Sequence, residues 1–212
     1  VDQMALVRQI QTGIDIDGDG RPDLDVNRIY VAGQSFGAGH GTMLLALDGA
    51  VQVGALNVPG GSAPEAGRLS AAIRPFVGAD FAARVPSLIN LSGTAFNEAI
   101  PLRDQPVLVN TVAGAFALAE NLDWQQWAQQ SANPVAYAPY IRRHPLHGHT
   151  AKAVLFQFAK GDQTNSNPTN TAILRAGELV DRATFYRHDL VFAANPTIPK
   201  DPHNFLTNAN AV

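Results

Sequence analysis

The residues best suited to carry out chemistry lie in the pentapeptide Gly-Gln-Ser-Phe-Gly at 33–37. An apolar run at 28–32 precedes it and a helical pattern reaching Leu47 follows it, so Ser35 is predicted on a sharp turn between a strand and a helix. Such a turn strains the serine backbone and brings positions 33 and 37 close together, which glycines allow. This context favours a nucleophilic serine over a glycine-rich turn that contains a serine by chance.

A serine hydroxyl becomes a nucleophile when a base removes its proton, and the base needs an acid to orient it. Asp162 lies in the turn that follows an apolar run at 153–158 and is the predicted acid, the alternative being an aspartate in a β-turn. Two histidines follow it, His188 at the end of a predicted strand and His203 in the next loop. A loop carries an imidazole over a sheet edge more readily, so we expect His203 to be the base and His188 to be structural.

The helix after Ser35 would point its first amides at the place where negative charge develops during attack on a carbonyl. The N–H of Phe36 is therefore the expected oxyanion donor. No cofactor is expected for this chemistry.

A second cluster of charged residues precedes the serine. Four aspartates stand at positions 1, 3, 5 and 9 of a calcium-loop pattern that has Gly20 at position 6: Asp15, Asp17, Asp19 and Asp23. Val26 occupies position 12, where such loops carry glutamate. We expect this loop to bind a structural calcium ion remote from Ser35, the alternative being a solvated acidic hairpin.

The elements that must position these groups alternate along the chain. Strands are predicted at 28–32, 51–58, 153–158 and 183–186, and helices near 4–10, after Ser35 and at 169–180. This order predicts an α/β fold with a parallel sheet.

The segment 62–150 is too long for an ordinary connection between two strands, and it contains helical patterns near 69–73, 112–118 and 122–127. The predicted organisation is a core of residues 1–61 and 151–212 with a helical cap at 62–150. Four aromatic residues in this cap form either an acyl pocket or ordinary core: Phe96, Phe116, Trp124 and Trp127.

Composition excludes several classes of protein. Among 212 residues, 15 Lys and Arg stand against 18 Asp and Glu, a net charge of -3, so nucleic acid is not an expected partner. Cysteine is absent, which excludes disulfides, thiolate zinc sites and cysteine nucleophiles. No run approaches the roughly 20 apolar residues of a transmembrane helix.

Taken together, these motifs resemble the α/β-hydrolase superfamily, and more narrowly the bacterial extracellular lipases and esterases of the virulence-factor type. The resemblance rests on these sequence segments: 15–23 followed by 28–37, and then 57–61, 101–106, 160–164 and 187–189. The resemblance implies hydrolysis of a small-molecule or lipid carboxylic ester through an acyl-enzyme, with Ser35, Asp162 and His203 as the triad. It also implies a lid and a secreted or periplasmic location.

Other interpretations remain open. The same triad serves polyester depolymerases, thioesterases and amidases, and the fold without catalysis would be a calcium-binding recognition module. Folds of this type also have strands and an oxyanion loop ahead of the nucleophile strand. We therefore expect an N-terminal segment or a second chain to complete the sheet, because strand 28–32 would otherwise be an exposed apolar edge.

Overall fold

The structure is a computed structural model that describes residues 2–99 and 112–203. The chain divides into two compact units. The first, which we call the sheet unit, comprises Val1–Gly61 and Asn133–Val212, and the second, the helical unit, comprises Ser62–Ala132.

The sheet unit contains a four-stranded sheet in which all neighbouring strands are parallel. Its order is β1 (Ile29–Gln34), β2 (Val51–Asn57), β3 (Ala153–Ala159) and β4 (Ala183–Tyr186). The predicted α/β class and the predicted strands are confirmed. Apolar, β-branched-rich runs bounded by turn residues are therefore a sufficient signal for these four strands.

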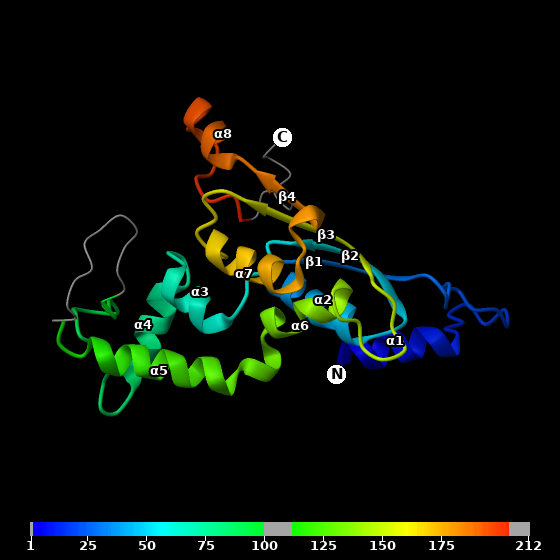
Figure 1. Cartoon of the computed structure of the whole chain (residues 1–212), viewed down its shortest axis with the longest axis horizontal. Coiled ribbons are helices and arrows are strands. Elements are labelled where there is room, and N and C mark those ends of the chain that lie inside the picture. The colour runs from blue at the N-terminus through cyan, green and yellow to red at the C-terminus, as the bar shows by residue number, and fades with distance from the viewer. Residues whose placement is uncertain (1, 100–111, 204–212) are drawn as a thin grey trace. The chain divides into compact units, whose positions relative to one another are not determined.

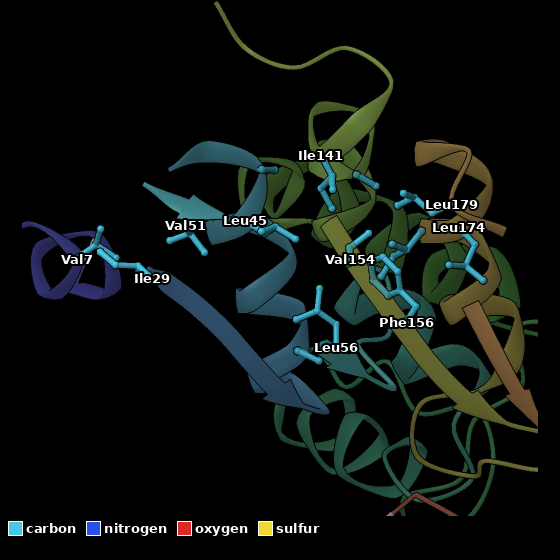
Figure 2. Close-up of a cluster of buried hydrophobic side chains, with 14 residues drawn as sticks. Val7, Ile29, Leu45, Val51, Leu56, Ile141, Val154, Phe156, Leu174 and Leu179 are labelled. Carbon is cyan, nitrogen blue, oxygen red and sulfur yellow. The ribbon is translucent and has the colours of Figure 1, made fainter. Parts of the chain in front are cut away.

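Three helices cover one face of this sheet: α2 (Phe36–Leu47), α6 (Pro134–Arg142) and α7 (Asn167–Gly177) (Figure 1). They share one apolar core with the strands (Figure 2), in which Leu45, Leu56, Ile141 and Phe156 are at most 1% exposed. The first helix, α1 (Asp2–Thr12), adds Val7 to this core. A 3₁₀ turn, η2 (Val180–Arg182), leads into β4, and α8 (His188–Ala194) follows it.

A buried lysine fastens the start of the sheet. The Lys152 ammonium donates hydrogen bonds to the carbonyls of Asp48, Gly49 and Val51 at 2.9, 3.2 and 2.6 Å. Burial lowers the pKa of this ammonium below its ordinary value. The lysine therefore links the end of α2 and the beginning of β2 to the segment that enters β3.

The boundary between the two units differs from the predicted cap of 62–150. Residues 133–150 group with the sheet unit, because Ala138 and Ile141 on α6 are fully buried in its core. Prolines at 134 and 139 give this segment the composition of a loop, yet Pro134 occupies the first turn of α6, where a missing N–H costs nothing.

The helical unit consists of α3 (Ala63–Leu69), α4 (Arg74–Ala83), α5 (Ala115–Ala128) and the 3₁₀ turn η1 (Gln130–Ala132). The expectation of a helix near 69–73 is wrong, since α3 ends at Leu69, and the two patterns at 112–118 and 122–127 belong to the single helix α5. The segment at 101–106 lies outside the described residues.

Aromatic residues have two different environments in the helical unit. Phe96 packs in its core with Phe81, Leu118 and Leu122, and the Arg74 guanidinium lies 3.9 Å from the Phe96 ring centroid. Three others are exposed on α5: Phe116, Trp124 and Trp127. Of the four aromatic residues considered in the sequence, Phe96 is therefore the one that belongs to an ordinary hydrophobic core.

The sheet carries apolar residues on its second face as well. Tyr30, Val53 and Leu155 are 59%, 38% and 42% exposed, and strand pairing places Tyr30 beside Val53 and Ala55 beside Leu155. Within the described residues, β1 has a neighbouring strand on one side only. Parallel sheets normally have both faces covered, so the exposure of these apolar side chains departs from the usual arrangement. No described helix has the length and apolar character needed to span a membrane.

We expect the isolated 212-residue chain to self-associate through this second face, because exposed apolar area of this kind drives association. Leu155→Lys should shift the sedimentation profile toward the monomer. Val180→Lys, at an apolar position that is 67% exposed outside the sheet, is the matched control and should change nothing. A wild-type chain that stays monomeric at every concentration tested would contradict this expectation.

Candidate active site

Ser35 lies at the junction between β1 and α2, as predicted. Its backbone has φ 55° and ψ −123°, a conformation that costs a non-glycine residue about 1–3 kcal/mol. Three hydrogen bonds fix it: the Ser35 N–H donates to the Asn57 carbonyl at 2.9 Å, and the Ser35 carbonyl accepts from Ala38 and Gly39 at 2.9 and 3.1 Å. The turn is therefore fixed by β2 on one side and by α2 on the other.

The two glycines that flank Ser35 have different roles. A Cβ added at Gly33 would lie 2.6 Å from the Gly37 carbonyl oxygen and 2.7 Å from the Ala38 backbone, so the chain does approach itself here. A Cβ added at Gly37 would meet nothing within 4 Å. Close packing thus requires glycine at 33 and does not require it at 37.

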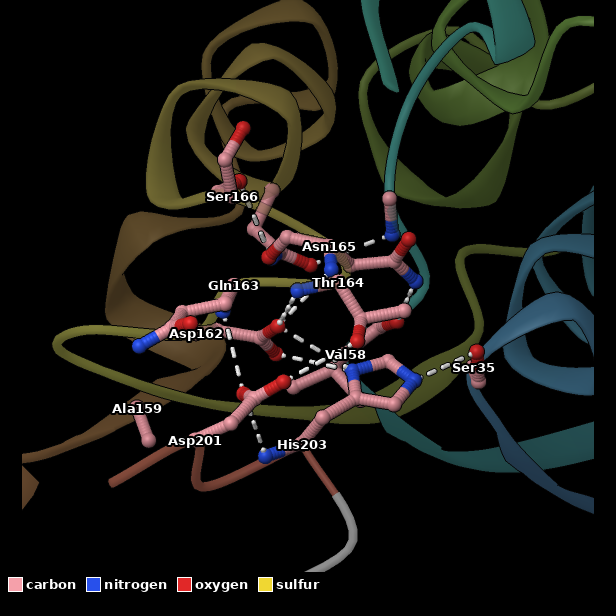
Figure 3. Close-up of polar contacts among 12 residues, drawn as sticks. Ser35, Val58, Ala159, Asp162, Gln163, Thr164, Asn165, Ser166, Asp201 and His203 are labelled. Carbon is pink, nitrogen blue, oxygen red and sulfur yellow. Dashed lines mark hydrogen bonds and ion pairs between the residues drawn. The ribbon is translucent and has the colours of Figure 1, made fainter. Parts of the chain in front are cut away.

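The side chains of Ser35, His203 and Asp162 form a continuous hydrogen-bonded chain (Figure 3). His203 Nε2 lies 2.8 Å from Ser35 Oγ, and His203 Nδ1 lies 3.0 and 3.1 Å from the two carboxylate oxygens of Asp162. This geometry suits the imidazole tautomer in which Nδ1 donates to the Asp162 carboxylate and Nε2 accepts from the serine hydroxyl. These are the three residues that the sequence predicts.

The Asp162 carboxylate is buried and accepts hydrogen bonds from the backbone of its own turn. Its residue is 6% exposed, and Oδ1 accepts the N–H groups of Thr164 and Asn165 at 2.8 and 2.7 Å. The Asn165 side-chain amide in turn donates to the Val58 carbonyl at 2.6 Å, just beyond the end of β2. This hydrogen bond joins the turn that carries Asp162 to the end of β2.

Gln34, the last residue of β1, links this strand to the loop that carries His203. Its Nε2 donates to the His203 carbonyl at 2.7 Å, and its Oε1 accepts a hydrogen bond from the Asn57 side chain. Sequence reasoning did not single out Gln34, because a bond between residues 169 positions apart leaves no local pattern.

His188 has a structural position. It was predicted at the end of a strand, whereas it begins α8, because β4 ends at Tyr186. Its ring is buried, and Nε2 lies 2.8 Å from the Pro199 carbonyl oxygen. His188 therefore contacts the loop that leads to His203.

Phe36 is the first residue of α2, so its N–H has no carbonyl four residues earlier within the helix to accept it. The residue is 75% exposed, and its ring lies 4.3 Å, centroid to centroid, from the His40 ring. The amide is placed beside Ser35 at the positive end of the helix dipole.

The acidic loop brings three of its four predicted ligands together. Carboxylate oxygens of Asp15, Asp17 and Asp19 all lie within 4.8 Å of one another, and the three residues are exposed. Hydrogen bonds from backbone amides, first that of Gly20, lower the pKa of Asp15. Asp23 is not in this group, and its carboxylate accepts the Ile16 N–H at 2.5 Å.

Comparison with protein-family models finds no match, and comparison with curated proteins finds none either. Among solved structures, acylaminoacyl peptidase in complex with Z-Gly-Gly-Phe-chloromethyl ketone is similar over 78% of this chain, with 13% sequence identity and a TM-score of 0.44. The match covers 20% of that protein, so this chain spans about a fifth of its length.

The different packing of the two glycines yields a test of the turn. We expect Gly33→Ala to lower the free energy of unfolding by about 1–3 kcal/mol, because backbone atoms must move to admit the methyl group. Gly37→Ala is the matched control and should stay within about 0.5 kcal/mol of wild type. Urea unfolding measures both, and equal losses in the two variants would contradict the packing difference.

Proposed function

We propose that Ser35, His203 and Asp162 form the catalytic triad of a serine hydrolase that acts on carboxylic esters. The observation that carries the proposal is the unbroken hydrogen-bonded chain from the serine hydroxyl to a buried carboxylate. The strained backbone of Ser35 supports it, since strain of this size persists where the surrounding structure fixes it, and such sites are commonly functional.

In the proposed reaction, His203 Nε2 takes the proton from Ser35 Oγ as that oxygen attacks the ester carbonyl carbon. Asp162 keeps the imidazole in the required tautomer and stabilises its positive charge. The Phe36 N–H donates to the oxyanion of the tetrahedral intermediate. The alcohol leaves with a proton from His203, and a water molecule activated by the same imidazole then releases the acid from the acyl-enzyme.

The choice of esters rests on the resemblance to bacterial lipases and esterases, because the triad itself serves every acyl transfer. Thioesters, amides and polyesters are the competing substrates, and a series of p-nitrophenyl esters assayed beside a thioester, an anilide and an insoluble polyester separates them. The lid role of the helical unit, the covering of β1 by a further segment or chain, and export from the cell stay predictions.

The triad predicts a specific set of variants. Ser35→Ala should abolish labelling by a fluorophosphonate probe, and Ser35→Ala and His203→Ala should each lower kcat for an ester by about 10⁴-fold or more. His188→Gln keeps an N–H for the Pro199 carbonyl and should retain most activity. Full activity in His203→Ala, or labelling that persists in Ser35→Ala, would refute the proposal, while a wild type that is neither labelled nor active would favour the recognition module.

We also propose that the acidic loop binds calcium for stability and not for catalysis. The juxtaposition of Asp15, Asp17 and Asp19 supports this proposal, since ionised carboxylates so close together repel one another until a cation joins them.

Calcium should therefore raise the melting temperature of the wild type, and a chelator should reverse this rise. At a calcium concentration a hundredfold above Kd, binding adds about 2.7 kcal/mol to the free energy of unfolding. Asp17→Ala removes one of the three clustered carboxylates and should lose most of the response. Asp181→Asn, at an exposed aspartate in η2, should respond like wild type. Identical melting curves with calcium and with chelator would disprove the site.

A further inference from the structure

A second carboxylate joins the two loops that bring the histidine and the acid together. Asp201 Oδ1 accepts the N–H of Gln163 at 3.0 Å, and Oδ2 accepts the hydroxyl of Thr164 at 3.1 Å (Figure 3). These donors belong to the turn that begins with Asp162. Two hydrogen bonds therefore join the loop that contains Asp201 to the turn that begins with Asp162.

The same carboxylate also orders the backbone of the histidine. Asp201 Oδ1 accepts the His203 N–H at 3.1 Å, a local turn of the kind that aspartate forms two residues ahead of an amide. Thr164 meanwhile donates its N–H to Asp162 and its hydroxyl to Asp201. Asp162 thus contacts the imidazole ring, while Asp201 contacts the main chain that carries it.

The imidazole needs this support because it must satisfy two partners at once. Its Nε2 lies 2.8 Å from Ser35 Oγ while its Nδ1 lies 3.0 Å from Asp162, so a small shift of the loop breaks one bond or the other. Displacing a catalytic group by about 1 Å costs on the order of 100-fold in rate.

We propose that Asp201 is a positioning residue for His203, acting by fixing the histidine loop to the Asp162 turn. This inference rests on the proposed hydrolase function. Asp201 does not touch the serine or the imidazole ring through any hydrogen bond seen in the structure, so its effect must pass through His203.

The chemistry of the two possible replacements separates geometry from charge. In Asp201→Asn the amide oxygen still accepts both N–H groups, and the Thr164 hydroxyl rotates to accept from the amide nitrogen. In Asp201→Ala all three bonds are lost. A positioning role therefore predicts that asparagine rescues most of what alanine removes.

The first test is steady-state ester hydrolysis by the full chain. Asp201→Ala should lower kcat about 100-fold with KM within about twofold of wild type, and Asp201→Asn should stay within about fivefold in kcat. Asp25→Ala is the matched control, because Asp25 makes the same local bond to Asn27, at 2.9 Å, away from the triad. Wild-type kcat in Asp201→Ala would overturn the proposal.

The second test is a double-mutant cycle. Thr164→Val removes one of the three bonds and should lower kcat about fivefold in the wild-type background, but should have no further effect in Asp201→Ala. Additive losses would show that Thr164 acts independently of Asp201 and would overturn the proposal. Should Asp201→Ala fail to fold, Thr164→Val with wild-type kcat would overturn it instead.

The third test does not need activity. The His203 Nδ1–H bonded to Asp162 should give a strongly downfield proton resonance in wild type that is absent from Asp162→Ala. We expect it to broaden or vanish in Asp201→Ala and to remain in Asp201→Asn. If the wild type hydrolyses no ester, the proposed function fails, but this resonance still tests the role of Asp201. An unchanged resonance in Asp201→Ala would refute that role.

Discussion

The hydrogen bond of 2.8 Å between Ser35 Oγ and His203 Nε2 connects residues 168 positions apart. A bond of this kind contributes only about 1 kcal/mol of net stability, less than the entropy of ordering the residues on either side of it. It therefore cannot assemble the site by itself. The two side chains meet because the strands, the turn at Asp162 and the loop before His203 are already fixed by other interactions.

The parallel sheet supplies most of that fixation. Strand pairing places Gln34 beside Asn57 and Asn57 beside Gln157, so β1, β2 and β3 end at one edge. Ser35 follows the first of these ends and Asp162 follows the third, which is where groups from distant segments converge in folds of this class. The chain between β2 and Asp162 can include a separate helical unit without disturbing this convergence, because the register of β3 on β2 sets where its end falls.

Features that depend on short-range interactions could be predicted from the sequence, and those that depend on long-range interactions could not. Ser35 and the strand around it were predictable because apolar runs and glycine positions are local signals. Order along the chain left both His188 and His203 as partners for Asp162, and the position of His203 in a loop selected it. Gln34 and Asp201 were missed because their partners are side-chain or backbone groups 169 and about 38 residues away, and no local spacing encodes such bonds. Helix α6 was not predicted, because its two prolines are typical of a loop. Its apolar residues are buried by contacts with distant parts of the chain, which the local sequence does not reveal.

The unequal roles of the two motif glycines show what the turn requires. Gly33 has no room for a methyl group, because the Gly37 carbonyl oxygen and the Ala38 backbone, at the start of α2, would lie 2.6 and 2.7 Å from it. Burial of Leu45 on the same helix contributes roughly 2 kcal/mol, an amount comparable to the strain in the serine backbone. Gly37 has open space around it, so packing does not explain the absence of a side chain there. A methyl group at this position would therefore displace no neighbouring atom, so of the two motif glycines close packing requires only Gly33.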